Sequence, residues 1–201
     1  MVIISHSDIK SVIHSYLGCL LTYFDISSAE IRTASAQSKD ETLQGKFDRG
    51  EDVYIACGKI YLGEDGWNAL SDKDKKTWRK AMKSTMLGIL YGLGKNSLAE
   101  RINASPEEAG RVIETVFKTY PKLKPYIERQ QVYPFTHDGR VNTLFGDTLV
   151  PPEWKYYLEA PTQREKKNLE ARIKRLAVNL PIQGGTSLAI KKDCGIMGNL
   201  L

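Results

Sequence analysis

The amino-acid sequence predicts a mostly α-helical protein of the α+β class, with short strands at either end of a helical block. The clearest evidence is segment 71–93, which has helical periodicity and begins with Ser71 and Asp74 in the spacing of a capping box. A second strong helix start lies at Ser105. Strand-like patterns are confined to the apolar run 16–24 and the alternation at 141–145.

The first quarter of the chain is predicted to contain a strand and then a helix. The apolar run 16–24 is followed directly by Asp25, which suggests a buried strand that ends in a carboxylate. The pattern of residues 28–47 is helical. A looser stretch follows, punctuated by Gly50, Gly58, Gly63 and Gly66.

The middle of the chain is predicted to be a series of helices. Segment 71–93 should stop at Gly92 and Gly94, and residues 95–103 form a short helical piece. The helix that starts at Ser105 should continue to about Tyr120. We expect Pro121 and Pro125 to interrupt the helical structure after that point.

The last third is predicted to hold a hairpin and a charged helix. Asp138 and Gly139 form a turn signal, and the alternation at 141–145 follows it. Residues 162–178 have the pattern of a charged helix. We expect Pro181 to disturb that helix, with two glycines following it.

The composition is that of a globular protein, with 41% hydrophobic and 26% charged residues among 201. The length suffices for one domain or two small ones. The longest apolar run is too short to span a bilayer, and no signal-peptide pattern follows the start, so we expect a cytoplasmic chain with no membrane partner. Three widely spaced cysteines, Cys19, Cys57 and Cys194, are expected to be reduced and mostly buried.

The net charge of +5 permits a polyanionic partner. Basic residues gather in two clusters, and a solvated helix face would give the same pattern. The first cluster comprises Lys73, Lys75, Lys76, Arg79, Lys80 and Lys83, and the second Lys166, Lys167, Arg172, Lys174 and Arg175.

The predicted helix 71–93 has two specialised faces. Arg79, Lys83, Leu87 and Tyr91 lie four residues apart and form one oblique stripe along ~18 Å of helix axis. That order of two cations, an apolar group and an aromatic ring suits a nucleoside triphosphate. The opposite face is expected to be core and comprises Trp78, Met82, Thr85, Met86 and Ile89. Spacing alone leaves open that the cations are solvated and that Leu87 and Tyr91 are core.

Three sequence motifs resemble those of family A DNA polymerases, the bacterial polymerase I-like family. Residues 25–32, D-I-S-S-A-E-I-R, resemble its motif A, and residues 79–92, which span R-K-A-M-K to L-Y-G, resemble its motif B. Residues 175–184, R-L-A-V-N-L-P-I-Q-G, resemble the motif of its palm helix. The motifs occur in the order of the family, and the resemblance covers roughly residues 5–186.

The resemblance implies a right-hand polymerase fold in which a helical fingers subdomain is inserted between partial palm segments. Residues 1–48 would be partial palm with motif A. Residues 49–163 would be the fingers with motif B. Residues 164–201 would return to the palm. Template-directed DNA synthesis from dNTPs on primer–template DNA is the implied function.

The resemblance also implies a role for each residue of the nucleotide site. Asp25 would ligate two Mg²⁺ ions, which stabilise the attack of the primer 3′-hydroxyl. Glu30 would block the ribose 2′-position and so favour deoxynucleotides. Arg79 and Lys83 would neutralise the triphosphate, with Lys83 counted among the catalytic residues. Leu87 would lie against the incoming nucleotide.

The implied DNA contacts come from two segments. Tyr91 would stack near the templating base, and Gly92 would let the template backbone approach. Asn179 and Gln183 would hydrogen-bond at the primer–template end, since amides can donate and accept. Arg175 would reach the same duplex.

The chain departs from the family pattern at several positions. Leu87 stands where most members have phenylalanine or tyrosine, and leucine there is typical of some bacteriophage members. Tyr54 occupies the place of a histidine that contacts the phosphates. As a dNTP-binding residue it could donate one hydrogen bond from its hydroxyl, but it carries no positive charge. Gly146 and Asp147 replace an arginine-containing run. We therefore expect a bacteriophage-type member.

No segment after Gln183 matches the H-D-E turn of the family's motif C, and the later aspartate, Asp193, lacks that context. The sequence thus predicts a fragment that needs the remainder of the polymerase, including the thumb and the motif C palm, for activity.

Other functions remain open from the sequence. A non-enzymatic helical nucleic-acid-binding module would explain the basic helices without metal chemistry. A single-subunit RNA polymerase fragment shares a related helix, although Glu30 and the Asn179–Gln183 pair favour the DNA enzyme. A broken reading frame with no function of its own is the third possibility.

Overall fold

The computed structural model describes residues 26–198, and side chains as far as Lys192. The predicted strand 16–24 and Asp25 lie outside the described residues. The described elements are α2 (Ala29–Ser38), α3 (Glu41–Asp48), α4 (Val53–Asn68), α5 (Asp72–Leu90), α6 (Lys95–Ile102), α7 (Pro106–Thr119), α8 (Leu123–Thr136), β1 (Val141–Asn142), β2 (Thr148–Leu149), α9 (Glu153–Glu159) and α10 (Gln163–Gly198).

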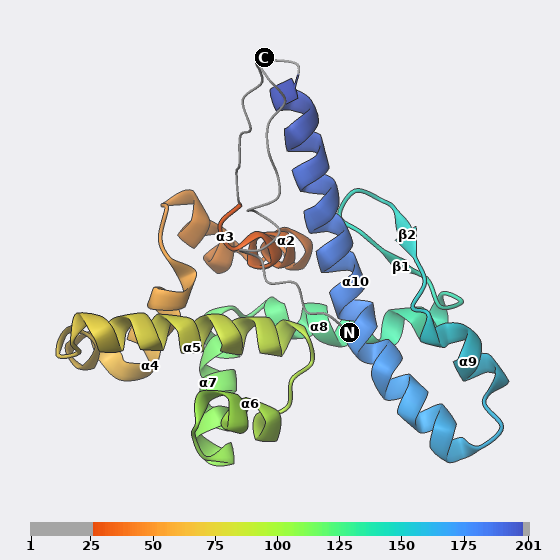
Figure 1. Cartoon of the computed structure of the whole chain (residues 1–201), viewed down its shortest axis with the longest axis horizontal. Coiled ribbons are helices and arrows are strands. Elements are labelled where there is room, and N and C mark those ends of the chain that lie inside the picture. The colour runs from red at the N-terminus through yellow and green to blue at the C-terminus, as the bar shows by residue number, and fades with distance from the viewer. Residues whose placement is uncertain (1–25, 199–201) are drawn as a thin grey trace, which may run out of the picture.

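The long helix α10 crosses the molecule, and the other elements lie on its two sides (Figure 1). Helices α2 and α8 pack directly on α10. Helices α4 to α7 project to one side, where α4 packs on α5 and α6 packs on α7. The hairpin and α9 lie on the other side. The prediction of a mostly helical α+β fold is confirmed.

The helical region predicted at 28–47 is two helices rather than one. The backbone of Lys39 is left-handed (φ 55°) and ends α2, and Asp40 then begins α3. The buried carboxylate of Asp40 accepts one hydrogen bond from the Leu43 N–H at 2.9 Å. Its other oxygen accepts from the Lys122 N–H at 2.8 Å. Asp40 therefore both caps α3 and ties it to the start of α8.

The prediction of a loose stretch between 50 and 66 is wrong for most of its length, because α4 covers it. Its helical start is fixed by Asp52, whose side chain caps the helix. At Gly63 the backbone is not helical (φ 78°, ψ 158°), so α4 consists of two helical pieces that meet at a kink there. Gly58 lies against the ring of Trp67, and a Cβ there would come within 2.5 Å of that ring. Here glycine serves close packing, which offsets its low helix propensity.

The predicted helices from 71 to 120 are confirmed. Ser71 Oγ accepts from the Asp74 N–H at 3.2 Å at the start of α5. Gly92, with φ 71°, turns the chain after α5 ends. Ser105 and Glu108 form the full capping box of α7. Local sequence signals decide these boundaries.

The helical structure is interrupted at Pro121, as predicted, because α7 ends at Thr119, but it is not interrupted at Pro125 or Pro181. Pro121 lies before α8, and Pro125 lies in its first turn, where the missing N–H has no intrahelical partner to lose. Helix α10 runs unbroken through Pro181. The buried Pro181 has its carbonyl oxygen bonded by the Gln37 Nε2 of α2 at 3.3 Å. Packing against α2 and α8 therefore offsets the cost of proline in this helix.

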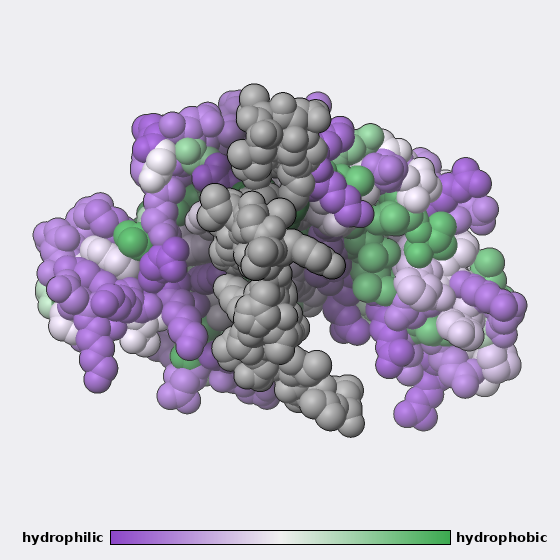
Figure 2. All heavy atoms as spheres, turned by 45° about the horizontal axis from the view of Figure 1, so that its top comes forward, coloured by the Kyte–Doolittle hydropathy of each residue, from purple (hydrophilic) through white to green (hydrophobic). Residues whose placement is uncertain are grey.

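The predicted hairpin is present, with a different turn. Strands β1 and β2 are antiparallel, with Val141 opposite Leu149. The Thr143 N–H donates to the Asp147 carbonyl at 2.8 Å in the connecting loop. The turn at Asp138 and Gly139 instead precedes β1. Apolar side chains reach the surface on this side of the molecule (Figure 2). The exposed apolar residues of the hairpin region are Leu144, Phe145 and Val150.

One main core joins helices α2 to α5, α7 and α8 to the middle of α10. Tyr54 and Cys57 of α4 pack there with Met86 of α5 and Tyr120 at the end of α7. Of the three cysteines predicted to be reduced and mostly buried, Cys57 is free and buried, whereas Cys19 and the side chain of Cys194 lie outside the described part of the chain. Among residues 26–198, no helix is long and apolar enough to cross a membrane.

Candidate functional site

Helix α5 has the two faces that the sequence predicts. Met82, Thr85, Met86 and Ile89 of the inner face are buried. On the stripe, Lys83 is exposed, and Leu87 and Tyr91 are half-buried against the main core. The stripe therefore presents an exposed lysine at its middle and partly covered apolar groups at one end.

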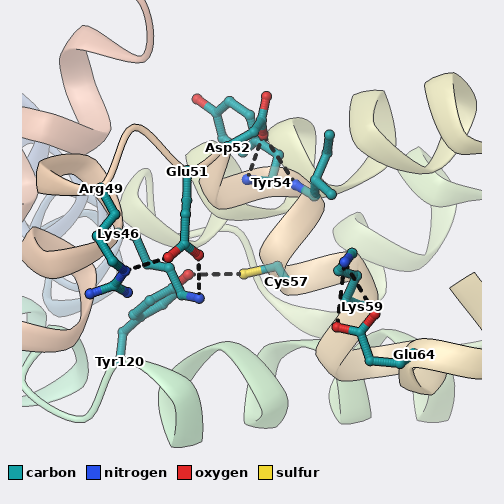
Figure 3. A network of polar contacts seen from close by, with 10 residues as sticks. Lys46, Arg49, Glu51, Asp52, Tyr54, Cys57, Lys59, Glu64 and Tyr120 are labelled. Carbon is teal, nitrogen blue, oxygen red and sulfur yellow. Dashed lines mark hydrogen bonds and ion pairs between the residues drawn. The ribbon is translucent and has the colours of Figure 1, made fainter.

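Arg79, at the other end of the stripe, is held by a carboxylate that the sequence analysis did not single out. Its Nε donates to Asp52 Oδ2 at 2.6 Å. The guanidinium carbon lies 5.5 Å from the centre of the Tyr54 ring. The other oxygen of Asp52 accepts from the N–H groups of Tyr54 at 3.0 Å and Ile55 at 3.1 Å. These helix-capping bonds are drawn in Figure 3. An aspartate just before an apolar run is an N-cap signal that could have located this residue.

Tyr54 is a core residue in this structure, with 1% of its surface exposed. Its hydroxyl has no hydrogen-bond partner within the described part of the chain. Burial raises the pKa of this hydroxyl, the nearby Ser28 side chain opposes the rise, and the carboxylates of Glu30 and Asp52 add to it. The predicted contact between Tyr54 and a phosphate would require the ring to leave the core, and that role stays a prediction.

A second set of ion pairs is centred on Glu51, the neighbour of Asp52 (Figure 3). Glu51 accepts from Lys46 Nζ at 2.6 Å and from Arg49 Nε at 2.5 Å. These contacts, with Lys46 the larger influence, lower the pKa of Glu51. Glu51 and Asp52 are thus adjacent carboxylates with different cationic partners.

The structure brings Glu30 of α2 close to Gln183 of α10. Both line a shallow groove with Thr186, Ser187, Ile190 and Lys191. Tyr91 lies near both side chains. Burial raises the pKa of Tyr91, the Gln183 side chain opposes this, and the Glu30 charge adds to it. Three predicted site residues that are far apart in the sequence therefore share one region.

Gly92 and Arg175 are also in contact. A Cβ on Gly92 would come within 3.0 Å of Arg175 Cγ. Arg175 is exposed, and Asn179 lies one turn further along α10. Asn179 Oδ1 is buried without a hydrogen-bond partner in the described residues. The turn after α5 therefore joins the stripe to the face of α10 that carries the predicted DNA contacts.

The predicted metal ligand cannot be placed, because Asp25 lies outside the described residues. Within residues 26–198, no group of three or more His, Cys, Asp or Glu side chains could hold a metal ion. The described residues alone therefore do not provide a metal site.

Comparison with known families gives one match over nearly the whole chain. The model of DNA polymerase family A matches residues 5–197. The thermostable DNA polymerase I of Thermus filiformis is 32% identical over 167 residues, which is 83% of this chain and 18% of that protein. DNA polymerase I of Deinococcus radiodurans is also 32% identical and is covered to 16% of its length. The chain thus spans less than a fifth of these relatives.

A solved structure resembles the chain in fold. The polymerase domain of Pol1 from M. smegmatis, in complex with DNA primer–template and dNTP, superposes with a TM-score of 0.64 at 25% sequence identity. The match covers 80% of this chain and 26% of that one.

Proposed function

The chain belongs to DNA polymerase family A, and from this premise we propose that it supplies the nucleotide-binding region for template-directed DNA synthesis. The observation that carries the proposal is the α5 stripe. Exposed Lys83 is placed between Arg79 and the partly covered Leu87 and Tyr91. A triphosphate needs cations at one end and a flat apolar surface at the other, and this stripe offers both.

Each stripe residue has a separate task in this proposal. Arg79 and Lys83 bind the phosphates, and Lys83 is additionally placed to stabilise charge that develops during transfer. Leu87 packs against the incoming base or sugar. Glu30 fills the space that a ribose 2′-hydroxyl would need. The proximity of Glu30, Tyr91 and Gln183 supports a common binding region.

DNA would be held at the adjoining face of α10. Tyr91 and Gly92 border the template, while Arg175, Asn179 and Gln183 contact the duplex near the primer end. The contact between Gly92 and Arg175 supports this arrangement, because it makes the two groups of residues one continuous surface.

The metal requirement belongs to the proposal as well. Two Mg²⁺ ions, with Asp25 as one ligand, would supply charge neutralisation at the transferring phosphate. The described residues do not build this site by themselves, so it would need Asp25 and further carboxylates. We likewise propose that the protein is a bacteriophage-type member, acts in replication in the cytoplasm and needs the remainder of the polymerase for activity.

The ternary complex distinguishes this function from a plain nucleic-acid-binding module. We would titrate the chain onto a primed DNA template, with Mg²⁺ and one dNTP at a time, and measure DNA affinity by anisotropy. The polymerase proposal expects the next complementary dNTP to tighten binding more than the other three. A binding module would show steep salt dependence and no response to dNTPs, which would contradict the proposal.

The same assay addresses the RNA polymerase alternative. Glu30 predicts that the matching ribonucleotide stabilises the complex less than the deoxynucleotide does. Replacement of Glu30 by alanine should reduce that difference. A preference for ribonucleotides in the unaltered chain would favour the RNA enzyme.

A further inference from the structure

The two carboxylate oxygens of Asp52 have separate partners. Oδ1 accepts from the backbone N–H groups of Tyr54 and Ile55 and so caps α4. Oδ2 accepts from Arg79 Nε on α5. The Asp52 side chain thus caps the start of α4 and holds Arg79 of α5.

The bond to Asp52 leaves most of the Arg79 guanidinium available. Arginine has five N–H donors in one plane, and within residues 26–192 only the one on Nε donates a side-chain hydrogen bond. The pair is partly exposed, at 42% for Arg79 and 30% for Asp52. A bond at Nε restricts the plane of the guanidinium, and the two terminal nitrogens keep the fork geometry that matches phosphate oxygens.

We propose that Asp52 is a positioning residue that holds Arg79 ready for the outermost phosphate of a bound dNTP. This inference rests on the proposed function. Arg79 stands at the end of the stripe furthest from Tyr91, which places it at the far end of the triphosphate. An arginine that is already ordered loses less freedom on binding, so Asp52 raises the affinity for dNTP without touching it.

The substitution Asp52→Asn separates the two tasks of this side chain. Asparagine caps helices as well as aspartate does, and its single oxygen can keep the bonds to Tyr54 and Ile55. Its amide group would then face Arg79, and an amide N–H₂ cannot accept a hydrogen bond from Nε. Asp52→Ser provides a second capping variant that is too short to hold Arg79. Glu51→Gln is the matched control, because it removes one adjacent negative charge whose partners are Lys46 and Arg49.

The test measures the affinity of the 201-residue chain for Mg²⁺-dNTP and for the corresponding deoxynucleoside monophosphate by calorimetry. Asp52→Asn should weaken dNTP binding by roughly three- to tenfold relative to Glu51→Gln, which is the usual effect of freeing one long side chain. Binding of the monophosphate should be equal in the two variants. In an Arg79→Ala background, Asp52→Asn should have no further effect on dNTP binding, a coupling that a merely structural role would not give.

The outcomes separate this inference from the proposed function. If the unaltered chain binds no dNTP, the proposed function fails and the role of Asp52 fails with it. If Arg79→Ala weakens binding while Asp52→Asn matches Glu51→Gln or binds more tightly, only the role of Asp52 is overturned. Circular dichroism on Asp52→Asn and Asp52→Ser checks that α4 remains folded, and the two variants should agree in dNTP affinity.

Discussion

Gly92, in the turn that ends α5, lies against the aliphatic stem of Arg175 on α10. Its backbone is left-handed, with φ 71°, and a Cβ at this position would lie 3.0 Å from Arg175 Cγ. Both the conformation and the space therefore favour glycine. This contact links the helix of the nucleotide stripe to the helix of the predicted DNA contacts.

Replacement of Gly92 by alanine should lower the free energy of unfolding by about 1–2 kcal/mol, because it adds backbone strain and crowding. Urea unfolding followed by circular dichroism measures this. Gly94 is a matched control two residues on, with φ −78° and no atom within 4 Å of an added Cβ. Gly94 is the N-cap of α6, so the loss of a favourable cap residue and the lower entropy of the unfolded chain oppose each other, and Gly94→Ala should change stability by only a few tenths of a kcal/mol. Equal effects of the two changes would contradict the structure.

Asp40 should be the most costly carboxylate to remove. It is 1% exposed and accepts N–H bonds from both Leu43 and Lys122. Asp40→Ala removes a helix cap and leaves a buried donor unpaired, so we expect a loss of about 2–4 kcal/mol in urea unfolding.

The neighbouring Glu41 serves as the control for Asp40. Its side chain is 88% exposed and forms a surface ion pair with Lys122. Glu41→Gln should change stability by less than about 0.5 kcal/mol. A comparable loss at both positions would show that the buried bonds of Asp40 matter less than we infer.

Stability should fall at alkaline pH through Cys57. Burial raises the pKa of its thiol from 9.0 to about 11. The unfolded chain therefore releases this proton at a lower pH than the folded chain does. The resulting contribution to stability is complete below pH 9 and is lost as the pH rises towards 11.

Urea unfolding at several pH values between 8 and 10.5 tests this expectation. Burial also raises the pKa of the hydroxyls of Tyr120 and Tyr126, which lowers stability at alkaline pH in the same way. The test therefore compares how steeply stability falls with pH in the unaltered chain and in Cys57→Ala. Cys57→Ala should make the decline with pH shallower, whatever its effect on stability at pH 8. Parallel slopes in the two proteins would contradict the burial of this thiol.

Tyr54→Phe should keep or raise stability, by up to about 1 kcal/mol. The reason is that the hydroxyl is buried and has no partner in the described residues, so its removal loses no bond. The change should leave dNTP affinity unaltered if the ring stays in the core. A clear loss of dNTP affinity would instead support the phosphate contact predicted from the sequence.

Much of the helical fold could be predicted because its signals are local. The cap at Ser71 and the capping box at Ser105 and Glu108 fix two helix starts, and both are present. The misses have tertiary causes. Gly58 continues a helix because Trp67 covers it, and Pro181 continues one because α2 and α8 pack against α10. Neighbours that are distant in the sequence outweigh local propensity at such positions.

The site was predictable in its parts more than in its contacts. Helical spacing correctly separated the buried Met82 and Met86 from the exposed Lys83. The family resemblance named Glu30, Tyr91 and Gln183, but only the fold shows that Glu30 and Gln183 line one groove and that both influence Tyr91. The Asp52–Arg79 pair joins residues 27 positions apart, and nothing in the periodicity of α5 reveals it.

The central claim is that the α5 stripe binds the triphosphate, and Lys83 tests it most directly. We would measure the affinity of the chain for Mg²⁺-dNTP with Lys83→Ala and with Lys80→Ala, which removes an equal charge from an exposed position on the same helix. Lys83→Ala should weaken binding by roughly tenfold or more, as expected for the loss of a charge-assisted contact, while Lys80→Ala should weaken it less than about twofold. Equal effects of the two changes would mean that dNTP affinity depends only on the overall charge of the helix, and the proposed site would be wrong.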